Sequence, residues 1–228
     1  MEMAASSATE NSDKDDHVHI TERWHSLNKA LEHLPKFQNK NQAGVQEEEI
    51  KKFESKYQIT LPNEIRAAIK VHDGRQHICC GLGYRLPTTD LLPIAQWKPY
   101  EIDNDVSSGD LFECLADKKD ACANAHLRED AREHLSAYME AKEKSEKSII
   151  KEVFKSLPCE LLIIGEVMDD YAEQYLLSIR SGRIYLAIHN IPEWRLIGTF
   201  ADWIEEGLDN VKEQDGELRE QHEDIEVD

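Results

Sequence analysis

The sequence has no long apolar run, and it has few basic residues for its acidity. A membrane-spanning helix needs about 20 consecutive apolar residues, and no run in these 228 residues approaches that length. The chain carries 46 acidic residues against 27 Lys and Arg residues, which gives a net charge of −19. Because binding to nucleic acids and to anionic membranes begins with Lys and Arg neutralising phosphates, this balance argues against both classes of partner.

A secretory leader and a disulfide framework are also missing. The first 16 residues lack the basic flank and the apolar stretch of a signal peptide, which predicts residence in a reducing cytoplasm or nucleus. An odd number of unevenly spaced cysteines is unlike a secreted disulfide scaffold. We therefore expect free thiols, several of them buried, at Cys79, Cys80, Cys114, Cys122 and Cys159.

Sequence motifs for nucleotide and acyl-transfer chemistry are absent. The chain has no G-x-x-x-x-G-K-[ST] phosphate loop and no G-x-S-x-G nucleophile elbow. Gly81-Leu82-Gly83 is a fragment of a dinucleotide motif without its third glycine, and a strand end is the favoured interpretation. A Cys–His nucleophilic pair stays open, because such partners meet in space and not in sequence order. We expect no catalytic residue and no cofactor.

Metal ligation has two weak candidates. One candidate is a group of two His and two Cys side chains within nine positions. Adjacent cysteines, however, point to opposite faces of a strand, and no C-x-x-C or H-x-x-x-H spacing accompanies them. The other is a pair of neighbouring aspartates after a strand, which in so acidic a chain favours an exposed turn over a cation site or an acid–base pair. The sequence predicts no metal at His72, His77, Cys79 and Cys80 or at Asp169 and Asp170.

Most of the negative charge lies at the two ends of the chain. Residues 1–19 carry a net charge of −4 and residues 209–228 carry −7. Both segments are poor in apolar residues, so burial cannot offset the entropy of ordering them. The sequence predicts disordered acidic tails at 1–19 and 209–228 around one domain at 20–208.

Helical periodicity marks both ends of this domain. Ile20, Trp24, Leu27, Leu31 and Leu34 recur at spacings of three and four, which predicts an amphipathic helix before Pro35. A second helix is expected at about 45–57 and a third at 63–72, where Pro62 suits a first turn and Asp73-Gly74 a stop. The last helix has Thr199 as N-cap and an apolar stripe formed by Phe200, Trp203, Ile204, Leu208 and Val211.

Between these helices the pattern changes to strands. Short apolar runs at 77–82 and 91–94 are punctuated by Gly and Pro, and 160–168 has the continuous apolar run of a strand buried on both faces. Strands at 174–180 and 183–188 flank Ser181-Gly182, which predicts a hairpin with a two-residue turn. The segment 102–157 is helical in pattern and highly charged in its middle, which predicts a solvated helical insertion.

The chain opens with a Trp-bearing helix, an acidic helix, the phrase Tyr57-x-Ile59-x-Leu61-Pro62-x-Glu64-Ile65 and an Asp-Gly turn, and it ends with a hairpin and a T-F-x-x-W-I helix. This order of elements resembles the opening and the end of the SUKH superfamily, whose best-known members are the Smi/Knr-type regulators of fungal cell-wall assembly. The motif residues are Trp24, Leu61, Pro62, Asp73, Gly74 and Trp203. The insertion at 102–157 and the two acidic tails depart from the compact pattern.

The resemblance implies an α+β fold: a mostly antiparallel sheet with helices packed against it. It also implies a non-enzymatic protein-binding module used as a scaffold or regulatory subunit. The alternative is an immunity protein that neutralises a toxin, such as a nuclease, because an acidic surface can occupy a basic active site. Acidity favours a basic protein partner in either case.

Two loop-like stretches offer candidate binding residues. Exposed aromatic side chains next to Arg or an acid are typical anchors of protein interfaces, whereas a buried Trp that closes the sheet is the opposing interpretation. Both interpretations stay open from sequence alone. The candidates are Trp97, Tyr100, Glu193, Trp194 and Arg195.

Overall fold

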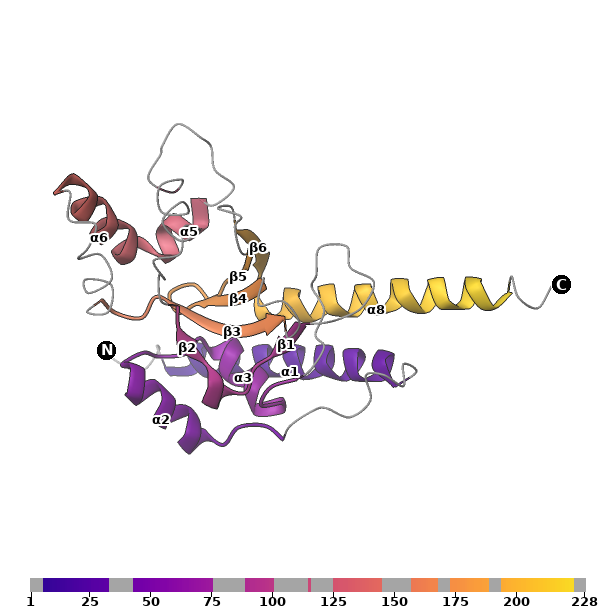
Figure 1. Ribbon diagram of the computed structural model, residues 1–228. Helices are drawn as coiled ribbons and strands as arrows, with labels where there is room; N and C mark the ends of the chain where they lie inside the picture. Colours follow the sequence, from indigo (N-terminus) through magenta and orange to yellow (C-terminus); the bar gives the residue numbers. More distant parts are fainter. Residues whose placement is uncertain are drawn as a thin grey trace.

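The computed structural model of the chain confirms an α+β domain built on one antiparallel sheet (Figure 1). It describes residues 6–32, 43–75, 89–100, 115, 125–144, 157–167, 173–188 and 194–223. The strands are β1 (Thr89–Leu91), β2 (Lys98–Pro99), β3 (Leu161–Val167), β4 (Glu173–Ser178), β5 (Ile184–Ile188) and β6 (Arg195–Gly198). They are ordered β1-β3-β4-β5-β6, and β2 pairs with β3 beside β1.

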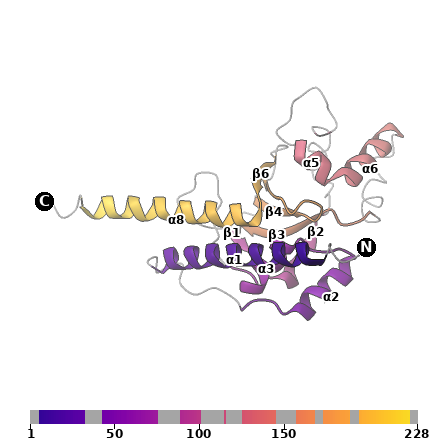
Figure 2. The same cartoon turned by 180° about the vertical axis from the view of Figure 1, so that it is seen from behind.

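Helices lie on both sides of this sheet, as the two opposite views agree (Figures 1 and 2). On one side lie α1, α2 and α3, and α8 packs against α1 and α3. On the other side lie α5 and α6, which belong to the predicted insertion. The helices are α1 (Ser6–Leu31), α2 (Glu47–Tyr57), α3 (Asn63–Val71), α5 (Ala125–Asp130), α6 (Arg132–Glu143) and α8 (Phe200–Glu223), with a 3-10 turn η2 (Ile94–Gln96).

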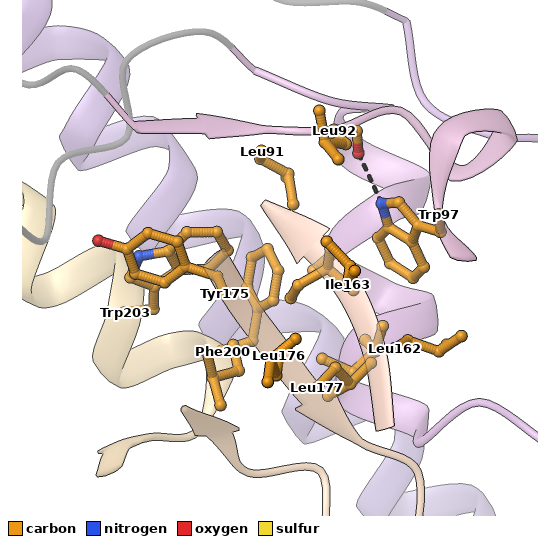
Figure 3. Packing of buried hydrophobic residues seen from close by; sticks show 14 of the residues in the cluster. Leu91, Leu92, Trp97, Leu162, Ile163, Tyr175, Leu176, Leu177, Phe200 and Trp203 are labelled. Atoms are coloured by element: carbon orange, nitrogen blue, oxygen red, sulfur yellow. Dashed lines mark hydrogen bonds between the residues drawn. The ribbon is translucent and has the colours of Figure 1, made fainter. Parts of the chain in front are cut away.

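The apolar periodicity of the first and last helices is confirmed by burial. Ile20, Trp24, Leu27 and Leu31 form the buried face of α1, and Phe200, Trp203, Ile204 and Val211 form that of α8. These residues join one core with the strands, in which Tyr175, Leu176 and Leu177 of β4 are fully buried (Figure 3). Leu34 lies outside the described residues.

The acidic ends of the chain are helical where the structure describes them. α1 begins at Ser6 and α8 ends at Glu223, so neither predicted tail boundary, at 19 or at 209, is a helix end. A nucleated helix gains one hydrogen bond for each residue it adds, which lets a packed helix continue through charged sequence. Residues 1–5 and 224–228 lie outside the described part, and disordered tails stay a prediction.

Helices α2 and α3 begin and end as their sequences dictate. Gln46 and Glu49 form a reciprocal capping box, and Gln58 ends α2 in the left-handed conformation. The Glu54 carboxylate accepts hydrogen bonds from the Leu61 backbone N–H (2.8 Å) and from Arg66 (2.5 Å), which ties the two helices together. Pro62 is the N-cap of α3, and the helix begins at Asn63, as predicted.

The predicted Asp-Gly stop is confirmed in position, although its role extends beyond the helix. Gly74 has φ +86°, and a Cβ atom there would lie 2.8 Å from the Pro93 nitrogen, so only glycine fits. Asp73 accepts a hydrogen bond from the Ile94 backbone N–H (2.7 Å). The turn therefore joins the end of α3 to η2 and β1.

Three predicted strands need correction. The predicted 91–94 strand ends at Leu91, because Pro93 has no N–H to donate and η2 begins directly after it. The β4–β5 hairpin has a five-residue connection, 179–183, because Ser178 bonds Arg183 and Gly182 bonds back to Ser178. The strands predicted to end at 180 and to begin at 183 are therefore too long. The predicted strand at 77–82 lies outside the described residues.

Candidate functional site

Trp97 belongs to the core and is not an exposed anchor. Its side chain is 2% exposed, and its indole Nε1 donates a hydrogen bond to the Leu92 carbonyl oxygen at 2.7 Å (Figure 3). Phe53 of α2 packs edge-on against it, with ring centroids 6.0 Å apart. The interpretation of Trp97 as an exposed binding residue is wrong, because η2 and β2 turn it inward; a buried Trp closing the sheet is correct.

Trp194 is buried as well, at 5% exposure, and the exposed interpretation is wrong there too. Its ring meets that of Tyr100 at 88°, with centroids 5.2 Å apart. Tyr100 is half-buried, and Arg195 pairs with Glu206 of α8. Glu193 lies outside the described residues. Of the predicted binding residues, Tyr100 and Arg195 retain partial exposure, and their binding role stays a prediction.

The motif residues of the predicted family serve the packing of helices on the sheet. Trp24 and Trp203 are fully buried, and Leu61 is 1% exposed. Pro62 faces the hairpin turn, because a Cβ atom added at Gly182 would lie 3.5 Å from the Cβ atom of Pro62. These positions therefore fix the frame of the domain.

The β4–β5 hairpin forms a receptor for a carboxylate, which Asp130 at the end of α5 occupies. One Asp130 oxygen, Oδ2, accepts hydrogen bonds from Ser181 Oγ at 2.7 Å and from Tyr185 Oη at 2.5 Å. Arg183 Nη1 lies 3.6 Å from the same oxygen. Asp130 is 1% exposed, so its charge is removed from water and is compensated by two hydrogen bonds and by the positive charge of Arg183.

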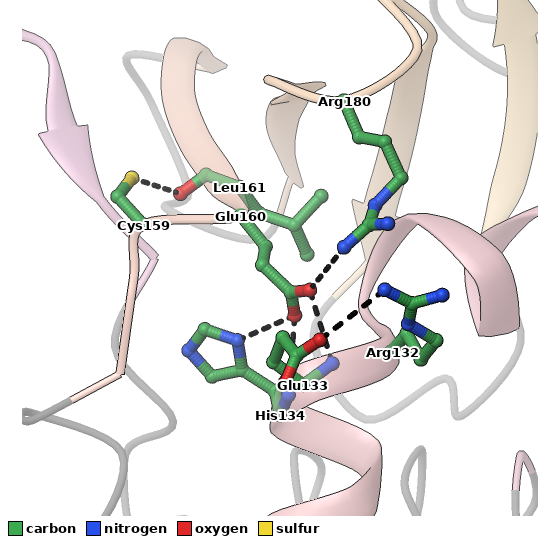
Figure 4. Close-up of polar contacts among 7 residues, drawn as sticks. All are labelled: Arg132, Glu133, His134, Cys159, Glu160, Leu161 and Arg180. Atoms are coloured by element: carbon green, nitrogen blue, oxygen red, sulfur yellow. Dashed lines mark hydrogen bonds and ion pairs between the residues drawn. The ribbon is translucent and has the colours of Figure 1, made fainter. Parts of the chain in front are cut away.

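A second buried carboxylate, Glu160, lies just before β3 and caps α6 (Figure 4). It accepts hydrogen bonds from the backbone N–H groups of Glu133 (3.0 Å) and His134 (3.1 Å). Its oxygens also face His134 Nδ1 at 2.7 Å and Arg180 Nη2 at 3.3 Å. The carboxylate thus satisfies two of the donors that a helix N-terminus leaves unpaired.

The pKa of Glu160 and the pKa of Tyr185, which contacts Asp130, are shifted in opposite directions. Burial opposes ionisation of Glu160, but the hydrogen bonds from His134 and from the backbone outweigh it and lower its pKa. Burial, reinforced by Asp130, raises the pKa of Tyr185. The Tyr185 hydroxyl therefore remains protonated and donates to the carboxylate.

Comparison with known proteins gives one family. The model of the SMI1 / KNR4 family (SUKH-1) matches residues 44–206, which is more than half of the chain. The chain belongs to the SMI1/KNR4 (SUKH-1) family. No curated protein matches it.

The SUKH match explains which parts of the chain form the common domain. It starts just before α2 and ends within α8, so α1 with Trp24 precedes it, although the predicted resemblance included that helix. It also runs across 102–157, the segment predicted as an insertion. SUKH domains bind protein partners and are generally non-enzymatic, so this chain is a protein-binding module.

Metal ligands, apolar helices and the Cys159 thiol are the remaining features to place in the part of this SUKH domain that the structure describes. Within it, no three His, Cys, Asp or Glu side chains gather as a metal site, and no helix is long and apolar enough to cross a membrane. Cys159 is half-buried, and burial raises the pKa of its thiol to about 12, which suits packing and not nucleophilic attack. His77, Cys79, Cys80, Asp169 and Asp170 lie outside the described residues.

Sequence reasoning missed the two buried carboxylates of this SUKH domain. Asp130 and Glu160 are two acids among 46, and their partners are up to 55 residues away in the chain. One signal was present: Leu127 and Ala131 share a helical stripe, and both are buried. Asp130 therefore holds the end of α5 at the β4–β5 hairpin, and Glu140 and Lys144 of α6 are exposed.

We expect replacement of Glu160 by Gln to destabilise the domain in a pH-dependent way. At pH 7 the variant loses charged hydrogen bonds and its free energy of unfolding falls by about 2–3 kcal/mol. Because folding lowers the pKa of Glu160, the ionised Glu160 side chain stabilises the fold fully at pH values above the ordinary Glu pKa of about 4.3. This stabilisation is lost as the pH falls through the pKa that Glu160 has in the folded protein. Urea unfolding at pH 7, 5 and 3.5 should therefore show the two proteins converging at the lowest pH.

The matched control for this experiment is Glu140→Gln. Glu140 is an exposed residue of α6 that pairs with Lys144 one turn away, and such surface pairs contribute little. We expect the control to match the wild type at each pH. A deficit of Glu160→Gln that persists unchanged at pH 3.5 would show that packing, and not charge, is responsible.

Proposed function

We propose that this SUKH domain acts as a scaffold or regulatory subunit that holds a protein partner without catalysing a reaction. Family membership over residues 44–206 is the observation that carries this proposal. The position of α5 and α6 supports it, since these helices add a surface to the protein-binding domain on the side of the sheet away from α1, α2 and α3.

The charge of the chain favours a basic partner. The segments 1–19 and 209–228 together carry −11 of the net charge of −19. Such a field accelerates the encounter with a positively charged protein and weakens as salt is added. We therefore expect attraction between the acidic segments and a basic partner, and not contact through a large apolar patch, to make association fast.

The second candidate is an immunity protein that neutralises a toxin such as a nuclease by direct binding. The same acidity favours it, because the active site of a nuclease is basic and an acidic inhibitor can occupy it. Long acidic segments are not needed by a compact inhibitor. For this reason we prefer the scaffold.

Affinity purification of the full chain at physiological salt tests the scaffold proposal. We expect a stable complex whose fixed stoichiometry is measured by light scattering. Its affinity should fall as the salt concentration rises from about 0.15 to about 0.5 M, because salt screens the attraction between surface charges. A chain with Glu213, Glu217, Glu220 and Glu223 changed to Gln should associate more slowly. Elution of the protein alone would overturn the proposal, whereas rescue of cells from a nuclease toxin would favour the immunity protein.

A further inference from the structure

The three groups that hold Asp130 all belong to one hairpin. Ser181 and Arg183 lie in the β4–β5 connection, and Tyr185 is the second residue of β5. Their donors converge on a single carboxylate oxygen at 2.7, 3.6 and 2.5 Å. All three donors therefore come from one hairpin, whose strands β4 and β5 pair directly with each other.

The occupant of this receptor is a short helix with a simple pattern. α5 has six residues and presents Leu127 and Asp130, one turn apart, to the domain. Leu127 is fully buried in the common core, whereas His126 and Glu129 of the same helix are exposed. A six-residue helix is not stable alone, so docking must hold it in place. The recognised pattern is Leu-x-x-Asp on a helix.

The α5–α6 pair lies apart from the other helices, although Leu127, Ala131 and Tyr138 belong to the common core. It lies on the side of the sheet opposite α1, α2 and α3 (Figures 1 and 2). Ala131 breaks the helix between α5 and α6, with φ −110° and ψ 32°, so the two helices are not one rigid rod. The aromatic core around Trp24, Phe200 and Trp203 is built without them.

We propose that the β4–β5 hairpin is a binding site for an amphipathic helix that presents Leu-x-x-Asp, and that α5 is its intramolecular occupant in the free protein. A partner helix with the same pattern replaces α5, accepts the hydrogen bonds from Ser181 and Tyr185 and takes over the ion pair with Arg183. This inference rests on the proposed protein-binding function and adds to it the chemistry of one contact.

An intramolecular occupant has a large advantage over a free competitor. Tethering gives α5 an effective concentration in the millimolar range, so an external helix competes poorly until α5 is weakened. Asp130→Asn keeps the size of the side chain but removes the charge that Arg183 and Tyr185 bind. The matched control is Glu129→Gln, which makes the same charge change on an exposed neighbour in the same helix.

Peptide binding tests the site directly. The probe is a fluorescein-labelled peptide with the sequence of residues 121–144, titrated against the full-length chains by fluorescence anisotropy. We expect the Asp130→Asn chain to bind it at least about tenfold more tightly than the wild type or Glu129→Gln chains, because its own α5 no longer competes effectively. A peptide that itself carries Asp130→Asn should bind at least about tenfold more weakly, since it lacks the charged acceptor.

Hydrogen exchange tests the same proposal without any peptide or partner. In the Asp130→Asn chain the amides of residues 125–144 should exchange faster than in Glu129→Gln, while those of β3, β4 and β5 keep their protection. If Asp130→Asn does not fold, Tyr185→Phe removes one donor and keeps the ring; it should give the same local increase. Exchange of 125–144 only together with the strands, or equal peptide binding by all chains, would overturn the proposal.

The results of peptide binding and hydrogen exchange do not depend on the affinity purification that tests the scaffold proposal. A chain that recovers no partner but shows local opening and peptide binding loses the proposed function and keeps the receptor. A chain that forms a complex while α5 never opens keeps the proposed function and loses the receptor.

Discussion

The Trp97→Ala chain is expected to lose about 3–5 kcal/mol of unfolding free energy, which is the usual cost of truncating a large buried aromatic side chain. Trp97 is nearly inaccessible to solvent, packs against Phe53, and donates its indole N–H to the Leu92 carbonyl. Truncation leaves a cavity between α2, η2 and the sheet, and it leaves that carbonyl without its indole donor. Equilibrium urea unfolding measures the loss.

Trp97→Phe is the matched control, because it retains most of the ring volume and removes the indole N–H. We expect a smaller loss of about 1–3 kcal/mol, the cost of an unsatisfied buried acceptor with modest repacking. If Trp97 were an interface anchor, Trp97→Ala would weaken partner binding and leave the unfolding transition in place. That pattern would contradict the burial described above.

The expectation that Trp97 and Trp194 are exposed failed for a physical reason. A stretch with prolines and no periodicity reads as a surface loop, and aromatic residues in surface loops are typical interface anchors. Here η2 forms directly after Pro93 and turns the Trp97 side chain under the sheet, while β6 brings Trp194 against Tyr100. Burial of a residue next to a short strand depends on which elements cover it, and local sequence does not contain that information.

Local patterns, by contrast, predicted the helices and the buried strand well. The stripe of α1, the Pro62 start of α3 and the apolar run of β3 each combine residue spacing with a stop signal within a few positions. The turn of the β4–β5 hairpin was placed correctly at Gly182, which has φ +73°. Its length was not, because the Ser178–Arg183 hydrogen bond is set by both strands together.

The carboxylate receptor could not be predicted, because its parts are distant in sequence. Asp130 meets Ser181 and Tyr185 across 51 and 55 positions, and neither hydroxyl has a distinctive local motif. A buried acid among so many exposed acids has no compositional signature. Only the tertiary fold, which brings the end of α5 to the β4–β5 hairpin, makes these residues neighbours.

Trp203→Ala is the second large loss that we expect, again about 3–5 kcal/mol for the cavity. Its ring stacks on Tyr175 of β4 at 4.8 Å between centroids, with 21° between the planes, and meets Phe200 edge-on at 5.5 Å. Such pairs contribute about 0.5–1.5 kcal/mol beyond burial. Because Trp203 joins α8 to the sheet, its removal should also loosen α8 against α1, visible as faster hydrogen exchange in residues 200–211.

The control for this helix is Asp209→Ala, an exposed position two turns further along α8 whose ion pair with Lys212 is on the surface. Surface pairs of this kind contribute at most about 1 kcal/mol, so the control should unfold close to the wild-type midpoint. Trp203→Phe should lie between the two, since a smaller ring still fills part of the space beside Tyr175. An unchanged midpoint for Trp203→Ala would mean that α8 is held by its other apolar residues alone, and that the SUKH-like Trp at this position has a role other than packing.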